Sequence, residues 1–377
     1  MKRLLTIILS TAMIFTALPW SAVSASAAEP EIELMAETQV FDGGTGTEED
    51  PYLISTAEQL RLIQDFPSCS YRLLNDIELT SWNYIGYAGD DFSGVFDGDY
   101  HTISGLTQRF VDVNNGTIKN TEFLGGSIAG STVANENNGT IENCVANANI
   151  KYGYTNKSNT TVRASGFVYI NKGTIDNCKY SGEISCGNSQ GPLYLSGFVY
   201  FNLGKISNCY INASISGSNY PFAHYFYGFC EDNRNDIINC YSKSLGSRSY
   251  GFCDSDDEVT TINCYFDKEL ATTTNGGTPK ATLAMKMQST YTDWDFDSVW
   301  DIDADLNDGY PYLRMEQNFL PDVDSITFDK QEFYLQTGGQ RTVAAEVIPS
   351  DTGRKQVWSS SANEVATVSE DGVVTAV

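Results

Sequence analysis

Two runs of alternating acidic residues are the first candidates for polar chemistry. Asp97, Asp99 and His101 stand two residues apart, so on one strand their side chains would share a face, as metal and acid–base sites require. Gly98 and its turn-forming neighbours favour a structural bend instead. We therefore predict no catalytic residue in this run.

The second run, Asp301-x-Asp303-x-Asp305 followed by Asn307-Asp308-Gly309, resembles the start of a calcium loop. Leu306 stands where that loop needs glycine, and Tyr312 stands where it needs a closing glutamate. Catalytic motifs of the His-Glu-x-x-His, Gly-x-Ser-x-Gly and phosphate-loop types are absent, and only two histidines are present. The sequence thus predicts no metal and no cofactor.

An aromatic segment, 220–227, is the better candidate for binding. It contains Tyr220, Phe222, His224, Tyr225, Phe226 and Tyr227. Tyrosines near Ser, Gly and Asn suit adaptable recognition. We predict that Tyr220, His224, Tyr225 and Tyr227 bind a ligand; the competing interpretation is that half of these side chains face a core.

Composition limits the possible partners. The 377 residues include 23 Lys plus Arg against 48 Asp plus Glu, a net charge of −25, which argues against nucleic acid. Only 19% of residues are charged and 41% are hydrophobic, with 22 Tyr, 19 Phe and 32 Gly, so the chain is expected to fold rather than stay disordered.

The first residues have the layout of a secretory signal. Lys2 and Arg3 precede an apolar run, 4–18, and Ala25-Ser26-Ala27 offers small residues for cleavage. The run is shorter than the roughly 20 residues of a membrane span, and Pro19 interrupts it. We predict a signal peptide at 1–27, a linker at 28–41 and no membrane span after cleavage.

An internal repeat organises the middle of the chain. Asn-x-Gly-x-Ile-x-Asn-Cys occurs at 137–144, 171–178 and 202–209, with looser copies before and after. The repeated isoleucine is expected at 118, 141, 175, 206, 237 and 262. A second motif, of the Ser-Gly-Phe-Val type, keeps the same phase at 165–168, 196–199, 227–230 and 250–253. Two phased motifs indicate a repeat architecture.

Each repeat contains short β-prone runs separated by Asn and Gly, which accept left-handed backbone angles. One unit cannot bury its apolar side alone, so copies must stack about 4.8 Å apart into a β-solenoid. Ile, Phe, Val and Cys would then form inward columns, and Asn would hydrogen-bond along the axis. Loops of unequal length, such as 152–162 and 216–225, would display binding residues.

The nine cysteines follow the same repeat. Five recur at one position (144, 178, 209, 240 and 264), and Cys230 and Cys253 take the position of Val168 and Val199. A Cys-x-x-Cys pair is lacking, which argues against zinc. An odd count in a continuous column has no natural disulfide pairing, so we predict mainly buried thiols.

Both ends of a solenoid need covering, because an open coil exposes unpaired edges. At the front, Ser55-x-x-Glu58 predicts a capping box before a short helix containing Leu60, Leu62 and Ile63. At the back, Thr278-Pro279 predicts the start of a second helix through Met285 and Met287. Trp294 and Trp300 are interpreted as core residues rather than ligand platforms.

Two family resemblances follow from these motifs. Residues 43–54 (GGTGTEEDPYLI), 92–106 (FSGVFDGDYHTISGL), the Asn-x-Gly-x-Ile-x-Asn-Cys copies and Gly309-Tyr310-Pro311-Tyr312-Leu313 resemble bacterial surface proteins with GLUG-type repeats. This resemblance implies a right-handed parallel β-helix at 42–317. From Val323, segments such as 357–361 (VWSSS) and 365–368 (VATV) resemble a bacterial Ig-like domain of group 2, expected at 318–377 and lacking its final strands. The fold class is therefore all-β.

Three functions are compatible with this organisation. The first is a secreted or cell-surface interaction module that binds an extracellular glycan or host protein. The second is a β-helix polysaccharide lyase or hydrolase, which needs carboxylates with Arg or Lys in one groove, although positive residues are sparse. The third is a purely structural cell-wall component. The sequence favours the first, and a binding protein over an enzyme.

Overall fold

The computed structural model describes residues 40–87, 89–152, 161–187, 191–217, 224–246, 249–255, 261–271, 276–321, 323–350, 357–369 and 371–377. All structural statements below refer to these residues. The predicted signal peptide, 1–27, and most of the predicted linker, 28–41, lie outside them.

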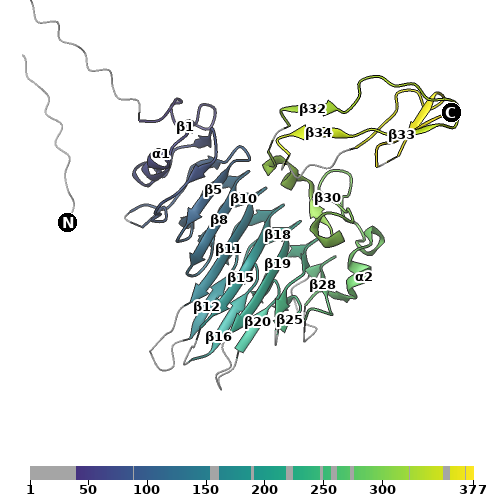
Figure 1. The fold of residues 1–377 in the computed structure, drawn as a ribbon. Coiled ribbons are helices and arrows are strands. Elements are labelled where there is room, and N and C mark those ends of the chain that lie inside the picture. Colours follow the sequence, from purple (N-terminus) through teal and green to yellow (C-terminus); the bar gives the residue numbers. More distant parts are fainter. Residues whose placement is uncertain are drawn as a thin grey trace, which may run out of the picture. The chain divides into compact units, whose positions relative to one another are not determined.

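Four parallel sheets make up most of the described chain (Figure 1). Sheet A contains β1 (Tyr52–Ile54), β2 (Tyr71–Leu73), β4 (Val95–Asp97), β7 (Thr117–Lys119), β10 (Thr140–Glu142), β14 (Thr174–Asp176), β18 (Lys205–Ser207), β22 (Ile237–Ile238) and β27 (Thr261–Ile262). Sheet B contains β3 (Ile77–Glu78), β5 (Thr102–Leu106), β8 (Glu122–Ile128), β11 (Val145–Tyr152), β15 (Lys179–Cys186), β19 (Tyr210–Gly217), β23 (Tyr241–Ser242), β24 (Leu245–Gly246), β28 (Tyr265–Asp267) and β29 (Thr278–Lys280).

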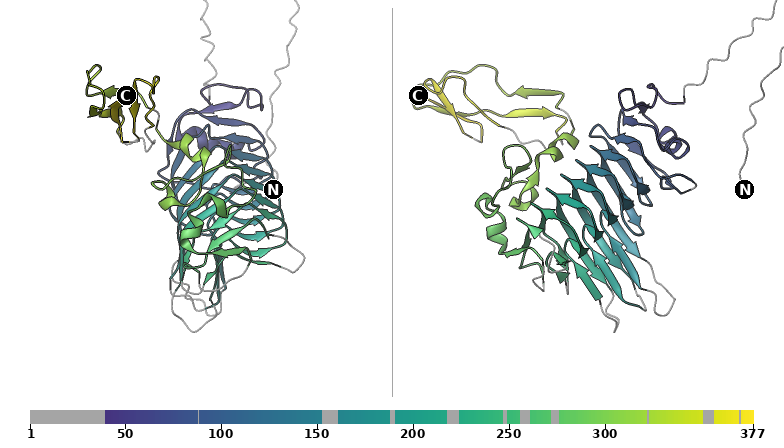
Figure 2. Two further views of the ribbon diagram at one scale, coloured as in Figure 1. Left: turned by 90° about the vertical axis from the view of Figure 1, so that its right-hand side faces the viewer. Right: turned by 180° about the vertical axis from the view of Figure 1, so that it is seen from behind.

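Two shorter parallel sheets complete the coils. Sheet C contains β6 (Val111–Asn114), β9 (Ala134–Asn137), β13 (Val168–Asn171), β17 (Val199–Asn202), β21 (Cys230–Asn233) and β26 (Cys253–Ser255). Sheet D contains β12 (Val162–Ser165), β16 (Leu193–Ser196), β20 (His224–Tyr227) and β25 (Ser249–Tyr250). One full coil runs through sheets D, C, A and B in turn, as in β12–β15, and the next coil repeats the path in β16–β19. The fold is thus a parallel β-helix, as predicted (Figure 2).

Identical residues form columns because the strands pair in register. Ile141 lies opposite Ile175, which lies opposite Ile206, and all three are fully buried. Phe167, Phe198, Phe229 and Phe252 stack with ring centroids 4.7, 4.8 and 4.7 Å apart. The predicted inward columns are confirmed at these positions.

The predicted repeat phase is wrong at its last copy. Ile237 pairs with Thr261, so Ile262 lies opposite Ile238 and is 42% exposed. Thr261 therefore takes the inward position that the other copies give to isoleucine.

Asparagine ladders fix two corners of each coil. At the corner between sheets C and A, the side-chain amide of each buried Asn donates to the Asn of the next coil, at 2.7–2.9 Å, through Asn114, Asn137, Asn171, Asn202 and Asn233. At the corner between sheets A and B, the Asn before each cysteine has φ near +50°, as at Asn143 and Asn177 (both φ 52). Asn tolerates this left-handed conformation better than most residues, which explains its recurrence.

The glycine of the Asn-x-Gly motif is required by close stacking. A Cβ atom on Gly139 would lie 2.0 Å from the carbonyl oxygen of Gly116, and one on Gly173 would lie 2.0 Å from that of Gly139. No side chain fits between backbones at that distance.

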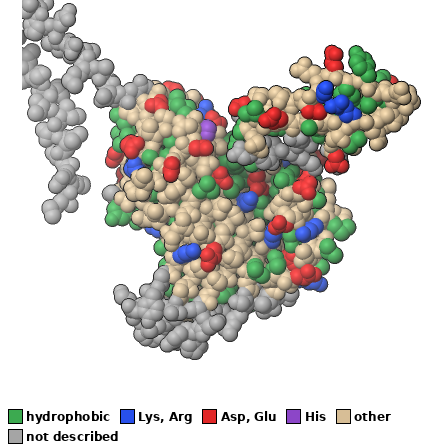
Figure 3. All heavy atoms as spheres, viewed as in Figure 1, with side chains coloured by type: hydrophobic (Ala, Val, Ile, Leu, Met, Phe, Trp, Pro, Cys, Tyr) green, Lys and Arg blue, Asp and Glu red, His purple; other side chains and the backbone are tan. Residues whose placement is uncertain are grey.

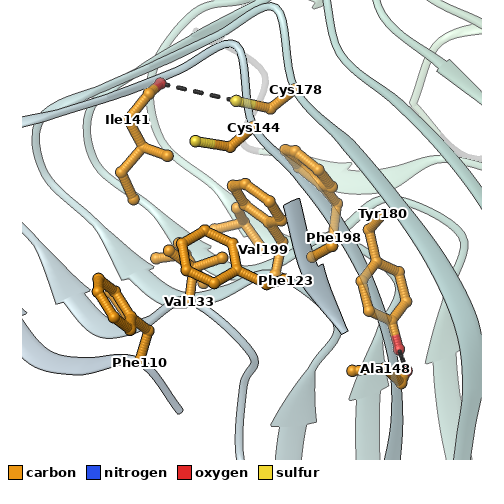
Figure 4. Close-up of a cluster of buried hydrophobic side chains, with 14 of the residues drawn as sticks. Phe110, Phe123, Val133, Ile141, Cys144, Ala148, Cys178, Tyr180, Phe198 and Val199 are labelled. Atoms are coloured by element: carbon orange, nitrogen blue, oxygen red, sulfur yellow. Dashed lines mark hydrogen bonds between the residues drawn. The ribbon is translucent and has the colours of Figure 1, made fainter. Parts of the chain in front are cut away.

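The cysteines are free thiols, and all except the half-buried Cys69 are buried. The Sγ of Cys178 donates to the carbonyl oxygen of Ile141 in the neighbouring coil, at 3.7 Å, with Cys144 beside it (Figure 4). Burial raises the pKa of Cys144, Cys209 and Cys264 well above the usual value. The column thus behaves as small apolar side chains with weak donors, as predicted.

A short helix is present at the front, with a different cap from the predicted one. Helix α1 (Ala57–Arg61) continues into η1 (Leu62–Asp65), and Leu60 and Ile63 are fully buried in the main core. The capping box is formed by Thr56 and Gln59, one residue later than the predicted Ser55 and Glu58. The Gln59 side chain accepts from the backbone N–H of both Ser55 and Thr56, which fixes the start of the helix.

The C-terminal part of the solenoid differs more from the prediction. Thr278 and Pro279 lie in strand β29, at the edge of sheet B where proline is tolerated, and helix α2 spans Thr282–Met285. The next elements are η2 (Gln288–Thr290), β30 (Trp300–Asp301), η3 (Asn307–Gly309), β31 (Tyr312–Leu313) and η4 (Arg314–Phe319).

This segment packs along the outer face of sheet B. A second core joins the outward Tyr210, Tyr241 and Tyr265 to buried Trp294 and Trp300, so both tryptophans are core residues, as predicted. Glu316 accepts hydrogen bonds from Lys179 and Tyr210, at 2.7 and 2.9 Å, which hold η4 to the sheet.

Residues beyond 324 form small antiparallel sheets. Strand β32 (Ser325–Phe328) pairs with β34 (Ala345–Ile348), and β36 (Val373–Ala376) pairs with both β33 (Gln340–Thr342) and β35 (Ala366–Val368). Strand β32 is exposed along its whole length. The arrangement is that of the predicted C-terminal Ig-like domain.

The buried Asn ladder predicts a specific loss of stability. Asn171→Ala removes the acceptor of the Asn137 amide and the donor to Asn202, and we expect it to lower the free energy of unfolding by about 2 kcal/mol. Asn138→Ala is the control, because Asn138 directly follows Asn137 but is exposed. It should change the free energy of unfolding by less than about 0.5 kcal/mol. Urea titrations followed by circular dichroism measure both; equal losses would contradict a structural role for the buried ladder.

The position of Cys230 predicts an order of substitutions. Val199 precedes Cys230 in the same column, so Cys230→Val should cost less than about 1.5 kcal/mol. Threonine has nearly the same shape as valine but would bury a hydroxyl group, so Cys230→Thr should lower the free energy of unfolding by about 1–3 kcal/mol. Chemical unfolding in reducing buffer compares the two, and a threonine variant as stable as the valine variant would show that this position is hydrated.

Candidate functional site

The structure places the predicted binding residues in different environments. Tyr220 lies outside the described residues, and His224 is described only through its backbone in β20. Tyr225 is half-buried, whereas Tyr227 is only 4% exposed. Tyr225 and Tyr227 are brought together around the ring of Tyr250, with centroids at 6.4 and 4.8 Å.

A polar and aromatic column follows the outer face of sheet D. Arg163, Tyr194 and Tyr225 are register partners on β12, β16 and β20, and their inward-facing neighbours such as Ala164 and Leu195 are fully buried. The rings of Tyr194 and Tyr225 stack with centroids 5.1 Å apart. Coil stacking therefore aligns these side chains at the spacing of the strands.

A parallel column lies on the outer face of sheet C. Tyr169, Tyr200 and Glu231 each follow the inward Val168, Val199 or Cys230 in sequence, so they point outward. The rings of Tyr169 and Tyr200 stack with centroids 4.9 Å apart. Tyr200 is nevertheless only 2% exposed, so other outward side chains must cover it.

The two columns meet across the corner between sheets D and C. The Nε of Arg163 donates to the hydroxyl of Tyr200 at 3.0 Å, and the guanidinium carbon of Arg163 lies 5.5 Å from the centre of the Tyr194 ring. We call this surface the corner strip. Its members are Arg163, Tyr169, Tyr194, Tyr200, Tyr225, Tyr227, Glu231 and Tyr250.

Partial burial changes the acidity of the strip. Burial raises the pKa of Glu231 to about 7, with help from the carboxylates of Asp232 and Asp254. Burial likewise raises the pKa values of Tyr200 and Tyr227, so both hydroxyls stay protonated at neutral pH. The accessible part of the strip thus offers the half-buried Tyr169, Tyr194 and Tyr225, one guanidinium and one carboxyl group that titrates near neutrality. Such groups suit hydrogen bonding to a polyhydroxylated ligand.

Sequence reasoning missed six members of the strip: Arg163, Tyr169, Tyr194, Tyr200, Glu231 and Tyr250. A periodic signal was available for three of them, because Tyr194 precedes Tyr225, and Tyr169 precedes Tyr200, by one repeat. The link between the columns had no such signal, because it depends on the angle at which sheets D and C meet.

The two acidic runs serve the structure. Asp97 accepts from the Asn120 side chain at 2.9 Å and from the backbone N–H of Asp99 at 3.0 Å, and Asp99 has φ 47. His101 contacts Asp76 at 3.3 Å, on a different segment. The run therefore forms the predicted bend, and Asp97 accepts the first of the side-chain hydrogen bonds that continue through Asn120, Asn143 and Asn177.

In the second run, a buried lysine pairs with the last acidic residue. The Nζ of Lys243, which is only 8% exposed, donates to the carboxylate of Asp308 at 2.7 Å and to the carbonyl oxygen of Asn307 at 3.3 Å. Asp301 pairs with Arg314 at 3.1 Å. Across the described residues, no group of three or more His, Cys, Asp or Glu is placed to hold a metal ion.

A pocket of about 370 Å³ lies between η4 and sheet B. It is lined by Glu122, Val145, Lys179, Leu306, Glu316, Gln317, Phe319 and Leu320. Lys179 pairs with Glu316, and Glu122 accepts from the Thr102 hydroxyl at 2.9 Å. Since these charged groups already have partners, we interpret the pocket as part of the attachment of η4.

The surface is acidic, and many of its positive groups sit beside acids. Figure 3 shows acidic side chains spread over one face, with Lys and Arg often next to them. The part of the chain that the structure describes contains no helix of the length and hydrophobicity needed to span a bilayer.

Comparisons with known proteins found a sequence relative, a solved structure and a family model. A stretch of this chain is 32% identical, over 110 residues, to a protein of Evansella cellulosilytica provisionally named a Gly-rich membrane protein. That match covers 24% of this chain and 13% of the relative, so the chain spans only a small part of its length.

A solved structure from Bacteroides ovatus, provisionally described as an immunoglobulin A1 protease, aligns with a TM-score of 0.50. The alignment covers 73% of this chain and 96% of that chain at 19% identity, and at that identity it shows a shared fold alone. Residues 322–377 match the family model of the bacterial Ig-like domain (group 2), the region that contains β32–β36. The chain thus joins a parallel β-helix to a C-terminal bacterial Ig-like domain of group 2.

Proposed function

We propose that this protein is a secreted or bacterial cell-surface interaction module that binds an extracellular glycan along the corner strip. Its β-helix, which we further propose to be of the GLUG type, is the rigid support. The observation that carries the proposal is the ordered pair of outward columns, Tyr194–Tyr225 and Tyr169–Tyr200, joined by Arg163.

The geometry of the strip favours an extended, hydroxylated ligand. Ring spacings of 4.9 and 5.1 Å repeat along the axis, so the strip presents equivalent aromatic positions at regular intervals to a ligand with a repeating structure. Tyrosine supplies large contact area with little loss of conformational entropy, and stacking already fixes these rings before binding.

Location is supported by the domain that accompanies the solenoid. Group 2 Ig-like domains occur in bacterial surface proteins, and this one occupies residues 322–377. The N-terminal segment, 1–27, has the layout of a secretory signal.

The comparisons do not favour the lyase or hydrolase alternative. On the outer face of sheet B, columns such as Asn147, Ser181 and Asn212 are polar and uncharged, which makes that face a poorer binding surface.

The proposal predicts glycan binding that depends on the strip. On a glycan array, the purified protein should bind a defined subset of extended glycans. Tyr194→Ala or Tyr225→Ala should weaken that binding tenfold or more, because truncating an aromatic residue at the centre of an interface removes a large part of the binding energy. Tyr227→Ala is a poor test, because this side chain is buried and its loss would disturb the corner.

Tyr334→Ala is the matched control, since Tyr334 is 96% exposed and lies in the Ig-like domain. It should leave binding unchanged. Absence of binding to every glycan on the array, or binding that both strip variants retain, would contradict the proposal.

A further inference from the structure

We propose that Arg163 anchors an acidic group, carboxylate or sulfate, so that the corner strip selects acidic polysaccharides over neutral ones. This inference rests on the proposed glycan binding and names the ligand class of the same site.

Among the described arginines, only Arg163 and Arg72 form no ion pair with a carboxylate. Five arginines pair with an acid: Arg61, Arg109, Arg234, Arg314 and Arg341. Among the described residues, the contacts of Arg163 are instead the Tyr200 hydroxyl and the rings of its neighbours, and the side chain is exposed. No ion pair with a described residue neutralises its charge, and the Glu231 carboxyl, which is near enough to interact with it, is mainly protonated below pH 7.

The side chain is also held in place. One hydrogen bond fixes its Nε, and the ring of Tyr194 lies against its guanidinium. A flexible arginine loses conformational entropy when it is fixed by a ligand, and here much of that loss has already occurred on folding. Within the described residues, only the Nε of Arg163 donates a hydrogen bond, so its two terminal nitrogens still have free N–H donors. A guanidinium group can bind a planar acid group with two parallel hydrogen bonds.

The charge of the whole chain sharpens this selection. With a net charge of −25, most of the surface repels an acidic polymer. Non-specific adsorption elsewhere is therefore disfavoured, and binding requires a local positive group. Lysine would supply the charge without the planar fork, so arginine at this position matters for geometry as well as for charge.

Glu231 makes the local charge depend on pH. Glu231 lies on β21, near Tyr200 of β17, Tyr227 of β20 and Arg163 of β12. Asp232 is next to it in sequence, and Asp254 lies on the neighbouring strand β26. Asp232 pairs with Arg234 at 2.8 Å. With a pKa raised to about 7, Glu231 is mainly protonated at pH 6 and mainly ionised at pH 8. Ionisation adds a negative charge near the acid of the ligand, so affinity should fall as the pH rises through 7.

The test uses matched pairs of oligosaccharides with the full-length protein. Uronate-containing and sulfated oligomers are compared with counterparts whose carboxylates are reduced to alcohols or whose sulfates are removed. By isothermal titration calorimetry at pH 6, at least one acidic member should bind tenfold or more tightly than its neutral counterpart.

Variants at Arg163 then identify the anchor. Arg163→Gln should lower affinity for the acidic member tenfold or more while leaving the neutral member unchanged, and Arg163→Lys should be intermediate. Arg72→Gln is the matched control, because Arg72 is also exposed and lies on β2, in sheet A. Glu231→Gln should keep the pH 6 affinity at pH 8. Thermal melts confirm that each variant is folded.

The two proposals can fail separately. Equal affinity for acidic and neutral members, or an Arg163→Gln variant that binds acidic members normally, overturns the anchor even if Tyr194→Ala still weakens binding. Absence of binding to every member overturns the proposed function and this inference together.

Discussion

In-register stacking of parallel coils is the constraint on which the rest of the structure depends. Every backbone donor and acceptor of a strand must pair with the coils above and below, about 4.8 Å away. Equivalent positions therefore face one another, and each position must suit a neighbour of its own kind. Isoleucine and phenylalanine satisfy this by apolar packing, and asparagine by carrying both a donor and an acceptor, so that each amide bonds to the next.

The same constraint explains the glycines and cysteines. Where two backbones approach too closely for a Cβ, as at Gly139 and Gly173, glycine recurs from coil to coil as far as Gly204, and Asn235 takes the position in the next coil. Where a small apolar group fits, cysteine replaces valine, as from Val199 to Cys230. The thiols serve packing, since they are buried, and burial raises the pKa of Cys144, Cys209 and Cys264 away from reactivity.

Outward positions obey the same alignment without the same need for burial. Sheet B presents polar columns that the C-terminal segment partly covers, with Tyr210 and Tyr241 joined to Trp300. Sheets C and D present the tyrosines of the corner strip, where two outer faces meet. A rigid coil repeat thus turns a periodic sequence into a periodic surface. The corner adds Arg163, which is held in place there without an ion pair among the described residues.

The sequence by itself determined the repeat unit, the β-helix, the inward columns, the Asn ladder and the C-terminal Ig-like domain, because those features repeat along the chain at the period of the coils. Tertiary structure alone decided three other features. The last copy slips, so that Thr261 and not Ile262 faces inward. The segment after β29 lies along sheet B, because the outward tyrosines of that sheet need covering.

Above all, Arg163 meets Tyr200 and Glu231 acquires its raised pKa through the corner between two sheets. Periodicity reports which residues are aligned along the axis. It carries no information on how far apart two columns lie around the coil, because that distance is set by the turns and by the side chains packed inside them.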